Sequence, residues 1–385
     1  MNGFTSPVTT SSAEAATPWT VEQVAAIDRS AMAVAPVIEA DDFRRISPAL
    51  DIWDAWPLQE LGGAPAKLAD GSTLWMALAA PQFPDPDDRH AHARIHLVQR
   101  TGDGWRHLGP TMPEGFSPGS REWSGSAVLV KDTHEVMLYF TATGRRGESR
   151  ITFEQRIFAA RARLDFSAGV PCLDAWRDLR EVVKRDPTYY MGGDEGLGSV
   201  GTIKAFRDPA FFHDPADGTN YLFFAGSAAR TQTEYNGVVG LARQEGASPG
   251  AWRTLPPLIS ANGLNNELER PHAVVNQGRY YLFWSTQAHV FDPGGPAGPT
   301  GLYGMTANTV MGPWRPLNRT GLVFANPASA PQQAYSWFVM PDLSVTSFVD
   351  NWGTQGLPGS ERRFGGSFAP DLRLALDGET AGLDL

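Results

Sequence analysis

The chain has little cysteine and little positive charge. Its 385 residues include one cysteine, Cys172, and 32 basic against 42 acidic side chains, so the formal net charge is −10. A single cysteine excludes an intramolecular disulfide and a cysteine-rich zinc site, so stability must come from packing of the core. The acidic balance argues against nucleic acid or an anionic membrane as a partner, because both select basic surfaces. A neutral, water-soluble substrate fits better.

Long apolar runs are also missing. The most apolar early segment, residues 31–38, is too short to span a bilayer and contains Pro36. The first residues show neither the basic region nor the apolar stretch of a cleavable signal peptide. We therefore expect a soluble protein that is cytoplasmic or exported without a classical signal peptide.

Glycine, proline and aromatic residues are abundant instead. The 40 Gly, 30 Pro and 12 Trp, with only 19% charged residues, are typical of a turn-rich globular protein built from many short strands. Five runs of mixed aromatic and aliphatic residues recur at steps of roughly 60 to 85 residues, the length of a small sheet with its loops. These runs are residues 74–78, 136–140, 221–224, 280–284 and 345–349. A Trp-Arg-x-Leu motif also repeats, beginning at Trp105, Trp252 and Trp314.

The repeats predict an all-β fold, a five-bladed β-propeller. A ring of sheets protects strand edges, whereas a flat stack would need polar capping repeats at its ends. Five units fill the chain after about residue 45, so we expect a propeller domain over residues 46–385 and an N-terminal tail over residues 1–45. Within the tail, residues 20–32 show a helical pattern with Thr20 as the N-cap.

Three acidic motifs precede the aromatic runs of separate units. They are residues 52–58 with Asp54, residues 206–209 with Asp208, and residues 267–272 with Glu267 and Glu269. We expect the motifs to occupy equivalent places on the innermost strands and to converge at the central channel. Three converging carboxylates suit glycosyl transfer through an oxocarbenium-like transition state. Glu267 and Glu269 share one face of a strand, and their like charges raise one pKa, as a general acid requires.

Some of these residues also have a structural explanation. Asp54 could tie down backbone amides between its two Trp neighbours, and Arg207 with Asp208 could form an ordinary ion pair. The pattern alone leaves both alternatives open.

Other polar motifs carry less weight. His90, His92 and His96 lie near three aspartates, as in a metal site, but their proline-broken, polar stretch favours a solvated loop, and we expect no bound metal. Residues 192–198 lack the lysine and helix of a phosphate-binding loop and favour a flexible loop beside the site. Ser124 has no nearby His/Asp arrangement, so it favours hydrogen bonding to a sugar over nucleophilic catalysis.

Taken together, the motifs resemble those of glycoside hydrolase family 68, which comprises levansucrases, inulosucrases and bacterial β-fructofuranosidases. The matching segments are Trp-Asp-x-Trp-Pro-Leu (53–58), Glu-Trp-Ser-Gly-Ser (122–126), Phe-Arg-Asp-Pro (206–209), Glu-Arg-Pro-His (269–272) and Gln-Ala-Tyr-Ser (333–336). Their order and spacing agree from Asp51 to Leu374. The resemblance implies a five-bladed propeller with a central, funnel-shaped active site that cleaves sucrose without a cofactor.

The resemblance also assigns roles. It implies that Asp54 is the nucleophile, that Asp208 stabilises the transition state, and that Glu269 is the general acid and then the base. The residues implied to hold the sugars are Trp53, Trp123, Ser124, Arg207, Glu267, Arg270, Gln287 and Tyr335. A fructosyl-enzyme intermediate would pass its sugar to water or to another sugar. Sucrose and sugar acceptors are therefore the expected partners, and the oligomeric state stays open.

The sequence departs from the family pattern at two positions. Ala225 stands where levansucrases tend to carry a Glu, and Gln287 stands where they carry an Arg or His on the acceptor side. We expect a weaker hold on a growing fructan, so that water or small sugars receive the fructosyl group. The absence of a cysteine pair and of an obvious acidic calcium loop resembles the Gram-negative-like branch, in which no metal is expected.

Three alternative functions stay open at this point. One is a levansucrase or inulosucrase that makes fructan polymer, and a second is a related propeller glycosidase acting on arabinosides or plant-type fructosides. The third is a non-catalytic sugar-binding propeller, although burying three carboxylates together would bring a binding module little benefit.

Overall fold

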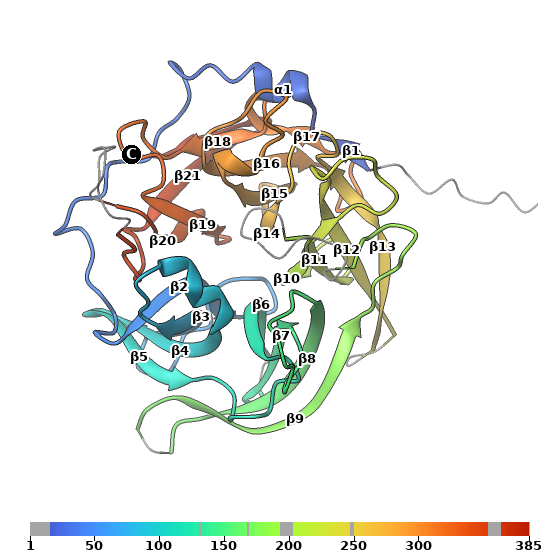
Figure 1. The fold of residues 1–385 in the computed structure, drawn as a ribbon. Coiled ribbons are helices and arrows are strands. Elements are labelled where there is room, and N and C mark those ends of the chain that lie inside the picture. The colour runs from blue at the N-terminus through green and yellow to red at the C-terminus, as the bar shows by residue number, and fades with distance from the viewer. Residues whose placement is uncertain are drawn as a thin grey trace, which may run out of the picture.

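Five antiparallel blades of four or five strands surround one central axis in the computed structural model (Figure 1). The structure describes residues 16–130, 132–167, 169–192, 203–246, 250–352 and 363–384. The all-β propeller predicted from the repeats is thereby confirmed. Residues 193–198 of the expected flexible loop lie outside the described residues.

Each blade is formed by one continuous stretch of chain. Blade I contains β2 (Leu50–Gln59), β3 (Thr73–Pro81), β4 (Arg94–Thr101) and β5 (Gly104–Pro110). Blade II contains β6 (Arg121–Val130), β7 (Glu135–Thr143), β8 (Gln155–Asp165) and β9 (Cys172–Val183). Blade III contains β10 (Phe206–His213), β11 (Asn220–Ser227), β12 (Gly237–Glu245) and β13 (Ala251–Ser260). Parallel pairing of β2 with β6, at Leu58 and Gln59, joins the first two blades.

The last two blades complete the ring. Blade IV contains β14 (Glu269–Asn276), β15 (Arg279–Thr286) and β16 (Gly301–Ala307), with β17 (Arg315–Pro316) and β18 (Leu322–Ala325) both pairing with β16. Blade V contains β19 (Ala334–Val339), β20 (Ser344–Val349), β21 (Leu372–Asp377) and β22 (Thr380–Leu383). Short 3-10 helices interrupt the loops at η1 (Pro86–Ala91), η2 (Ala288–Val290) and η3 (Leu317–Arg319).

The five aromatic runs form the second strand of every blade. They fall on β3, β7, β11, β15 and β20, whose residues are almost entirely buried. Sheets covered on both faces need near-continuous apolar strands, which explains why these runs do not alternate with polar residues. The repeated Trp-Arg motif marks the outer edge instead, since Trp105 lies on β5 and Trp252 on β13.

The innermost strand of every blade contains a β-bulge at the same place. The register slips by one residue between Trp53 and Trp56, Trp123 and Gly125, Arg207 and Ala210, Glu269 and His272, and Tyr335 and Phe338. Four of these bulges hold a non-glycine residue at positive φ, namely Asp54 (49°), Asp208 (61°), Arg270 (49°) and Ser336 (61°). Such residues are strained and cluster at functional sites.

The bulges correct one detail of the predicted geometry. Asp54 and Asp208 occupy the same bulge position, but the residue equivalent to them in blade IV is Arg270. Glu269 lies one residue earlier, at the place of Trp53 and Arg207. The expected equivalence of the three carboxylates is therefore wrong by one residue for Glu269, because the bulge lets two neighbouring residues reach the axis.

The N-terminal helix is shorter than predicted. Helix α1 spans Val21–Ala25, and Thr20 caps it by accepting a hydrogen bond from the Gln23 amide, while the Gln23 side-chain oxygen accepts one from the Thr20 backbone amide. The helix does not continue to residue 32, because the Asp28 carboxylate binds the amide and hydroxyl of Ser30. Such local bonds compete with helical hydrogen bonding.

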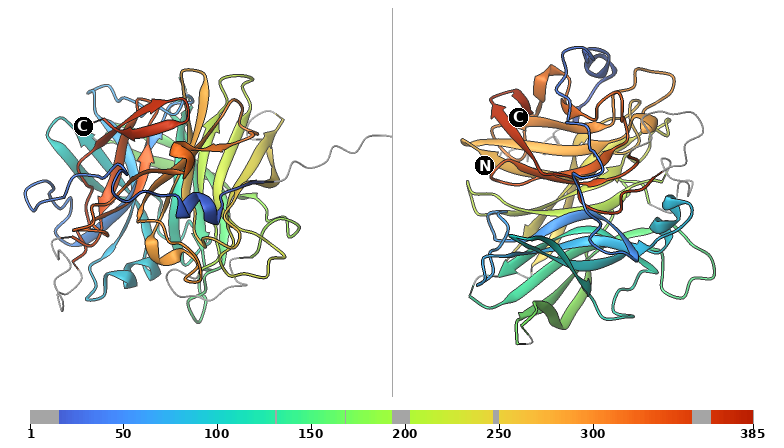
Figure 2. Two further views of the ribbon diagram at one scale, coloured as in Figure 1. Left: turned by 90° about the horizontal axis from the view of Figure 1, so that it is seen from above. Right: turned by 90° about the vertical axis from the view of Figure 1, so that its left-hand side faces the viewer.

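Residues 16–45 follow the outside of blades III, IV and V and reach blade I (Figure 2). Strand β1 (Thr17–Pro18) adds to the outer edge of β13, and Val34 bridges to Ala325. Further along, Arg45 forms an ion pair with Asp51 of blade I and donates to the Gly365 carbonyl that follows blade V's second strand. The division of the chain near residue 45 stays a prediction. No helix in the described part of the chain is long and apolar enough to cross a membrane.

Trp19 anchors this segment, and its loss should destabilise the protein. The ring is 1% exposed, packs against Trp284 and Tyr303 at 5.4 and 5.0 Å between ring centroids, and donates to the Thr320 carbonyl. We expect Trp19→Ala to lower the free energy of unfolding by about 3–5 kcal/mol, measured by denaturant titration. The control Val21→Ala, at a side chain 38% exposed, should change it by less than about 0.5 kcal/mol. Equal effects of the two substitutions would contradict this anchoring role.

Candidate active site

A cavity of about 370 Å3 lies where the five innermost strands converge. Every blade contributes two residues to this cavity, namely the residue directly before its bulge and the next residue, which lies in the bulge. These ten residues are Trp53, Asp54, Trp123, Ser124, Arg207, Asp208, Glu269, Arg270, Tyr335 and Ser336. With Glu267 and Gln287, which also line the cavity, the structure brings together all eleven site residues that the sequence predicted.

Asp54 is half-buried and lines the cavity. Its Oδ2 accepts a hydrogen bond from the Ser124 hydroxyl at 2.8 Å, so blade II orients a side chain of blade I. Trp53 is 2% exposed and forms an apolar wall beside it. Asp54 is therefore held in one orientation while part of its surface faces the cavity, as a nucleophile requires.

Asp208 is buried deeper. Its Oδ2 accepts from the Arg270 amide at 3.3 Å and lies 3.7 Å from the Arg207 Nε. Its own amide donates to the Thr141 hydroxyl. Burial and the neighbouring carboxylates Glu269 and Asp54 raise the pKa of Asp208 to about 7, against the opposing effect of Arg207.

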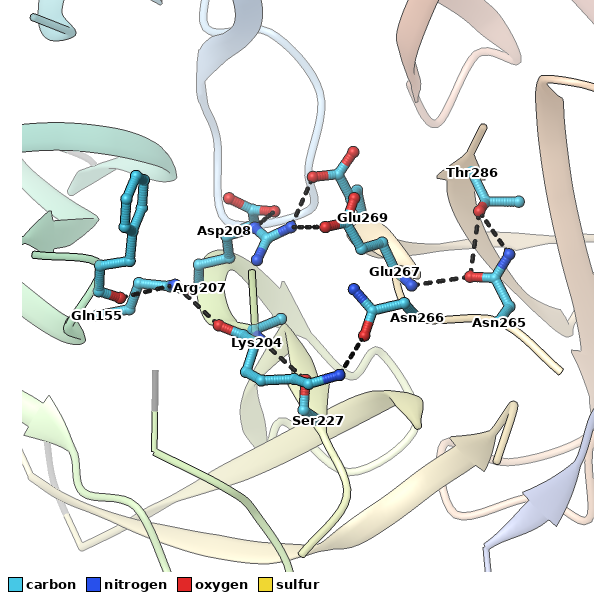
Figure 3. Close-up of polar contacts among 12 residues, drawn as sticks. Gln155, Lys204, Arg207, Asp208, Ser227, Asn265, Asn266, Glu267, Glu269 and Thr286 are labelled. Atoms are coloured by element: carbon cyan, nitrogen blue, oxygen red, sulfur yellow. Dashed lines mark hydrogen bonds and ion pairs between the residues drawn. The ribbon is translucent and has the colours of Figure 1, made fainter. Parts of the chain in front are cut away.

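Arg207 connects the acidic side chains of blades III and IV (Figure 3). Its Nη2 lies 2.7 Å from Oε1 of Glu269 and 3.6 Å from Oε1 of Glu267. The ion pair that sequence analysis left open thus exists between Arg207 and Asp208, but it is one contact in a larger cluster. An arginine shared by three carboxylates fixes their relative positions and decides which of them stay ionised.

The two carboxyl groups of the Glu267–Glu269 pair have pKa values that are shifted in opposite directions. Burial and the adjacent Glu269 raise the pKa of Glu267 to about 8. Burial also acts on Glu269, but Arg207 and the Tyr335 hydroxyl, which donates to Oε2 at 2.5 Å, lower its pKa overall. One pKa of the pair is raised, as the sequence predicted, but in the sugar-free site it belongs to Glu267 rather than to the expected acid Glu269.

Arg270 is occupied by protein groups on both terminal nitrogens. Nη1 donates to the hydroxyl and carbonyl oxygens of Ser336, and Nη2 donates to the Ala55 carbonyl at 2.6 Å. The side chain thereby joins blade IV to blades V and I. The expectation that Arg270 binds sugar hydroxyls stays a prediction, because its described bonds are structural.

Sequence reasoning missed one wall of the cavity. The polar stretch that was expected to be a solvated loop is helix η1, in which Arg89 is 4% exposed and stacks over the rings of Trp53 and Phe364 at 5.3 and 4.1 Å. The His90 carbonyl accepts from the Trp123 indole, and the His90 ring lines the cavity. An available signal was Asp85 followed by proline, a common helix start.

The three histidines of this stretch do not converge. His90 faces Trp53, His92 stacks on Phe83, and His96 stacks on His107 from the neighbouring strand. Within the residues that the structure describes, no group of three or more His, Cys, Asp or Glu side chains is arranged to hold a metal ion.

The two departures from the family pattern occupy different places. Gln287 precedes η2, is half-buried and lines the cavity. Ala225 is 1% exposed and lies outside the cavity wall, opposite Arg207 in the β10–β11 register. The expected loss of an acceptor contact at position 225 stays a prediction. Nη1 of Arg207 is buried without a hydrogen-bond partner among the described residues.

Fold and site together define a class. The axis of the propeller gathers Asp54 with the Ser124 hydroxyl, Glu269 with the Tyr335 hydroxyl, and Asp208 beside Arg207 and the Arg270 amide, and these carboxylates are the groups that glycosidases use. The levansucrase/invertase family model matches residues 8–237 and 231–385, so the chain belongs to this family.

Individual relatives agree with this assignment. Levansucrase LscC of Pseudomonas savastanoi pv. glycinea is 34% identical, over 89% of this chain and 85% of its own length. An inulosucrase from Halalkalicoccus jeotgali, solved with kestose bound, superimposes with a TM-score of 0.87 at 35% identity and covers 96% of this chain and 95% of that one. The catalytic domain of a β-fructofuranosidase from Microbacterium saccharophilum K-1 gives a TM-score of 0.82 at 26% identity, over 96% and 90% of the two chains.

The raised pKa of Glu267 makes stability depend on pH. A carboxyl with a folded pKa of about 8 and an ordinary value of 4.5 is neutral in both states at low pH, and its buried charge costs stability as pH rises through this window. We expect Glu267→Gln to raise the Tm relative to wild type by at least about 2 °C at pH 9, with a smaller difference at pH 5. Calorimetry at both pH values measures this, with exposed Glu60→Gln as the control. A difference independent of pH would contradict the assignment.

Proposed function

We propose that the protein is a retaining, sucrose-cleaving enzyme that forms a fructosyl-enzyme intermediate and passes fructose to water or small sugars. The observation that carries this proposal is the placement of Asp54, Asp208 and Glu269 around one cavity, each on a different blade. Family membership supports sucrose as the substrate. The proposed activity is that of a β-fructofuranosidase and fructosyltransferase.

In the first step Asp54 attacks the anomeric carbon of the fructosyl unit. The bond from this carbon to the glucosyl oxygen breaks, and Glu269 delivers a proton to that oxygen so that glucose leaves as an alcohol. Asp208, deep in the cavity, stabilises the positive charge that develops on the fructosyl ring. The Ser124 bond to Oδ2 leaves Oδ1 of Asp54 as the attacking oxygen.

In the second step Glu269 becomes the base. It removes a proton from water or from a sugar hydroxyl, whose oxygen then attacks the same carbon and releases Asp54. Two inversions retain the anomeric configuration. Tyr335 and Arg207, which bind the two oxygens of Glu269, stabilise its ionised form between the steps. Before the first step, the proton that Glu267 holds must move to Glu269, which then acts as the acid.

The acceptor side of the cavity favours small acceptors. Gln287 offers a neutral amide where an Arg or His would supply a charged or ring donor, and Ala225, which pairs with Arg207 in the β10–β11 register, offers no polar group where a Glu would supply a carboxylate. Weaker contacts with an incoming chain reduce the residence of a growing fructan, whereas they do not hinder water or a single sugar.

The catalytic assignments predict distinct losses. We expect Asp54→Asn, which tolerates the positive φ, to abolish glucose release from sucrose. Glu269→Ala should lower turnover of sucrose by about 10²–10⁴-fold but have a much smaller effect on a fructoside with a good leaving group. Glucose release is assayed enzymatically, with exposed Glu60→Gln as the control.

Two results would contradict these assignments. Absence of glucose release by the wild-type enzyme would overturn the proposed function, and equal losses of Glu269→Ala on both substrates would overturn the acid role.

The acceptor assignment predicts a change in product distribution. We expect Gln287→His to raise the ratio of sugar transfer to hydrolysis about fivefold, equivalent to one added hydrogen bond to the acceptor of about 1 kcal/mol. Free glucose minus free fructose, measured at high sucrose, gives the transferred share, and Gln287→Asn is the matched control. If Gln287→His leaves the ratio unchanged, the residue does not determine the fate of the fructosyl group.

A further inference from the structure

A buried lysine behind the cavity has no place in the catalytic scheme above. Lys204 is 6% exposed and lies two residues before β10. We propose that Lys204 is a positioning residue for the Glu267–Glu269 pair, because it binds the residue next to Glu267 and supplies the positive charge that limits how many protons the carboxyl cluster retains. The kinetic part of this inference rests on the proposed function.

The ammonium group of Lys204 is fully hydrogen-bonded. Nζ donates to Oδ1 of Asn266 at 2.7 Å, to Oδ1 of Asn236 at 3.2 Å and to the carbonyl of Glu234 (Figure 3 shows the Asn266 bond). Three acceptors match its three N–H groups. All three are neutral oxygens, and no ion pair of Lys204 is found among the described residues.

A buried cation with only neutral acceptors is costly to maintain. Burial lowers the pKa of Lys204, whereas the more distant charges of Glu234 and Glu267 act in the opposite direction. Neutral side chains could bridge three neutral oxygens at a lower cost in desolvation. The positive charge itself therefore has a use, and Glu267 is the carboxylate of the cavity on which it acts.

The hydrogen bonds connect Lys204 to Glu267 through the backbone. Asn266 directly precedes Glu267, and the Glu267 amide donates to Oδ1 of Asn265 at 2.8 Å. The Asn265 side chain in turn binds the Thr286 hydroxyl at 2.9 Å (Figure 3). The segment before β14 is thus fastened to the start of β10 on one side and to the end of β15 on the other.

Lys204 changes the charge balance of the cluster. The cavity is lined by six carboxyl groups, from Asp54, Asp87, Asp208, Glu267, Glu269 and Asp350, and by the guanidinium groups of Arg89, Arg207 and Arg270. Fully ionised, these groups carry a net charge of −3, and Lys204 reduces the negative charge by one. A cation held beside Glu267 therefore lowers the number of protons that these carboxyl groups retain.

Two further titratable groups near Glu269 carry no charge. Burial, together with Arg89, lowers the pKa of His90 to about 3, so its ring is neutral. Burial and Glu269 raise the pKa of Tyr335 well above its ordinary value, so it stays a neutral donor. Glu234 accepts a hydrogen bond from Lys204 through its backbone carbonyl and is not among the residues that line the cavity.

Substitution of Lys204 tests the inference through the pH profile of sucrose cleavage. Lys204→Met removes the charge, Lys204→Arg keeps it, and Asn266→Ala keeps it but removes the bond to the segment before β14. We expect Lys204→Met to move the alkaline limb of kcat/KM upward by about one pH unit, because the pair holds its proton more tightly without a nearby cation. Lys204→Arg should restore the limb, and Asn266→Ala should lower kcat while leaving the limb in place.

A second measurement does not depend on turnover. NMR titration of the protein labelled with 13C at the glutamate carboxyl groups follows Glu267 directly, with Glu267→Gln identifying its signal. We expect Lys204→Met to raise the apparent pKa of this signal by about one unit as well. Failure of wild-type protein to release glucose would overturn the proposed function, whereas this titration would still decide the role of Lys204.

Each outcome of these experiments either supports or overturns the positioning role of Lys204. An upward shift in Lys204→Met that Lys204→Arg reverses supports the positioning role. An unchanged Glu267 titration in Lys204→Met overturns it, whether or not the variant unfolds at a lower temperature, and leaves Lys204 as a purely structural cross-link.

Discussion

A one-residue slip in the innermost strand of each blade is the constraint on which the site depends. In a regular strand successive side chains point to opposite faces, so only every second residue could reach the axis. The bulge brings two consecutive residues of each strand to the cavity, which pairs Trp53 with Asp54 and Glu269 with Arg270. The positive φ of four bulge residues costs roughly 1–2 kcal/mol each, and packing between blades must offset that strain.

The same geometry separates the carboxyl groups by their neighbours. Asp54 has a hydroxyl partner, whereas Glu267 and Glu269 share the Arg207 guanidinium. A nucleophile and an acid need opposite protonation states at one pH, and different surroundings are how a protein gives chemically equal groups different states. Arg207 is central to this difference, because it lies within ion-pair distance of three carboxylates.

Spacing and motif chemistry predicted the ring of five sheets and the convergence of the carboxylates at its axis, because buried strands and acidic motifs are local patterns. The residues expected to hold the sugars came from the family resemblance. Three features were not accessible in this way. The bulge offset of Glu269 depends on strand register, the place of Ala225 behind Arg207 depends on which strands pair, and the wall formed by η1 depends on burial of Arg89 by distant rings. Each of these three features is set by contacts between residues far apart in the chain, which the local periodicity of the sequence does not reveal.

The segment of residues 16–45, which follows the outside of the blades, has a consequence for the order in which the molecule folds. Trp19 needs the rings of Trp284 and Tyr303 and the carbonyl of Thr320, all of which lie more than 260 residues later in the chain. Every blade, by contrast, is contiguous in sequence and can form from its own residues. Residues 16–45 can therefore take their final place only after blade IV, against which Trp19 packs, has formed.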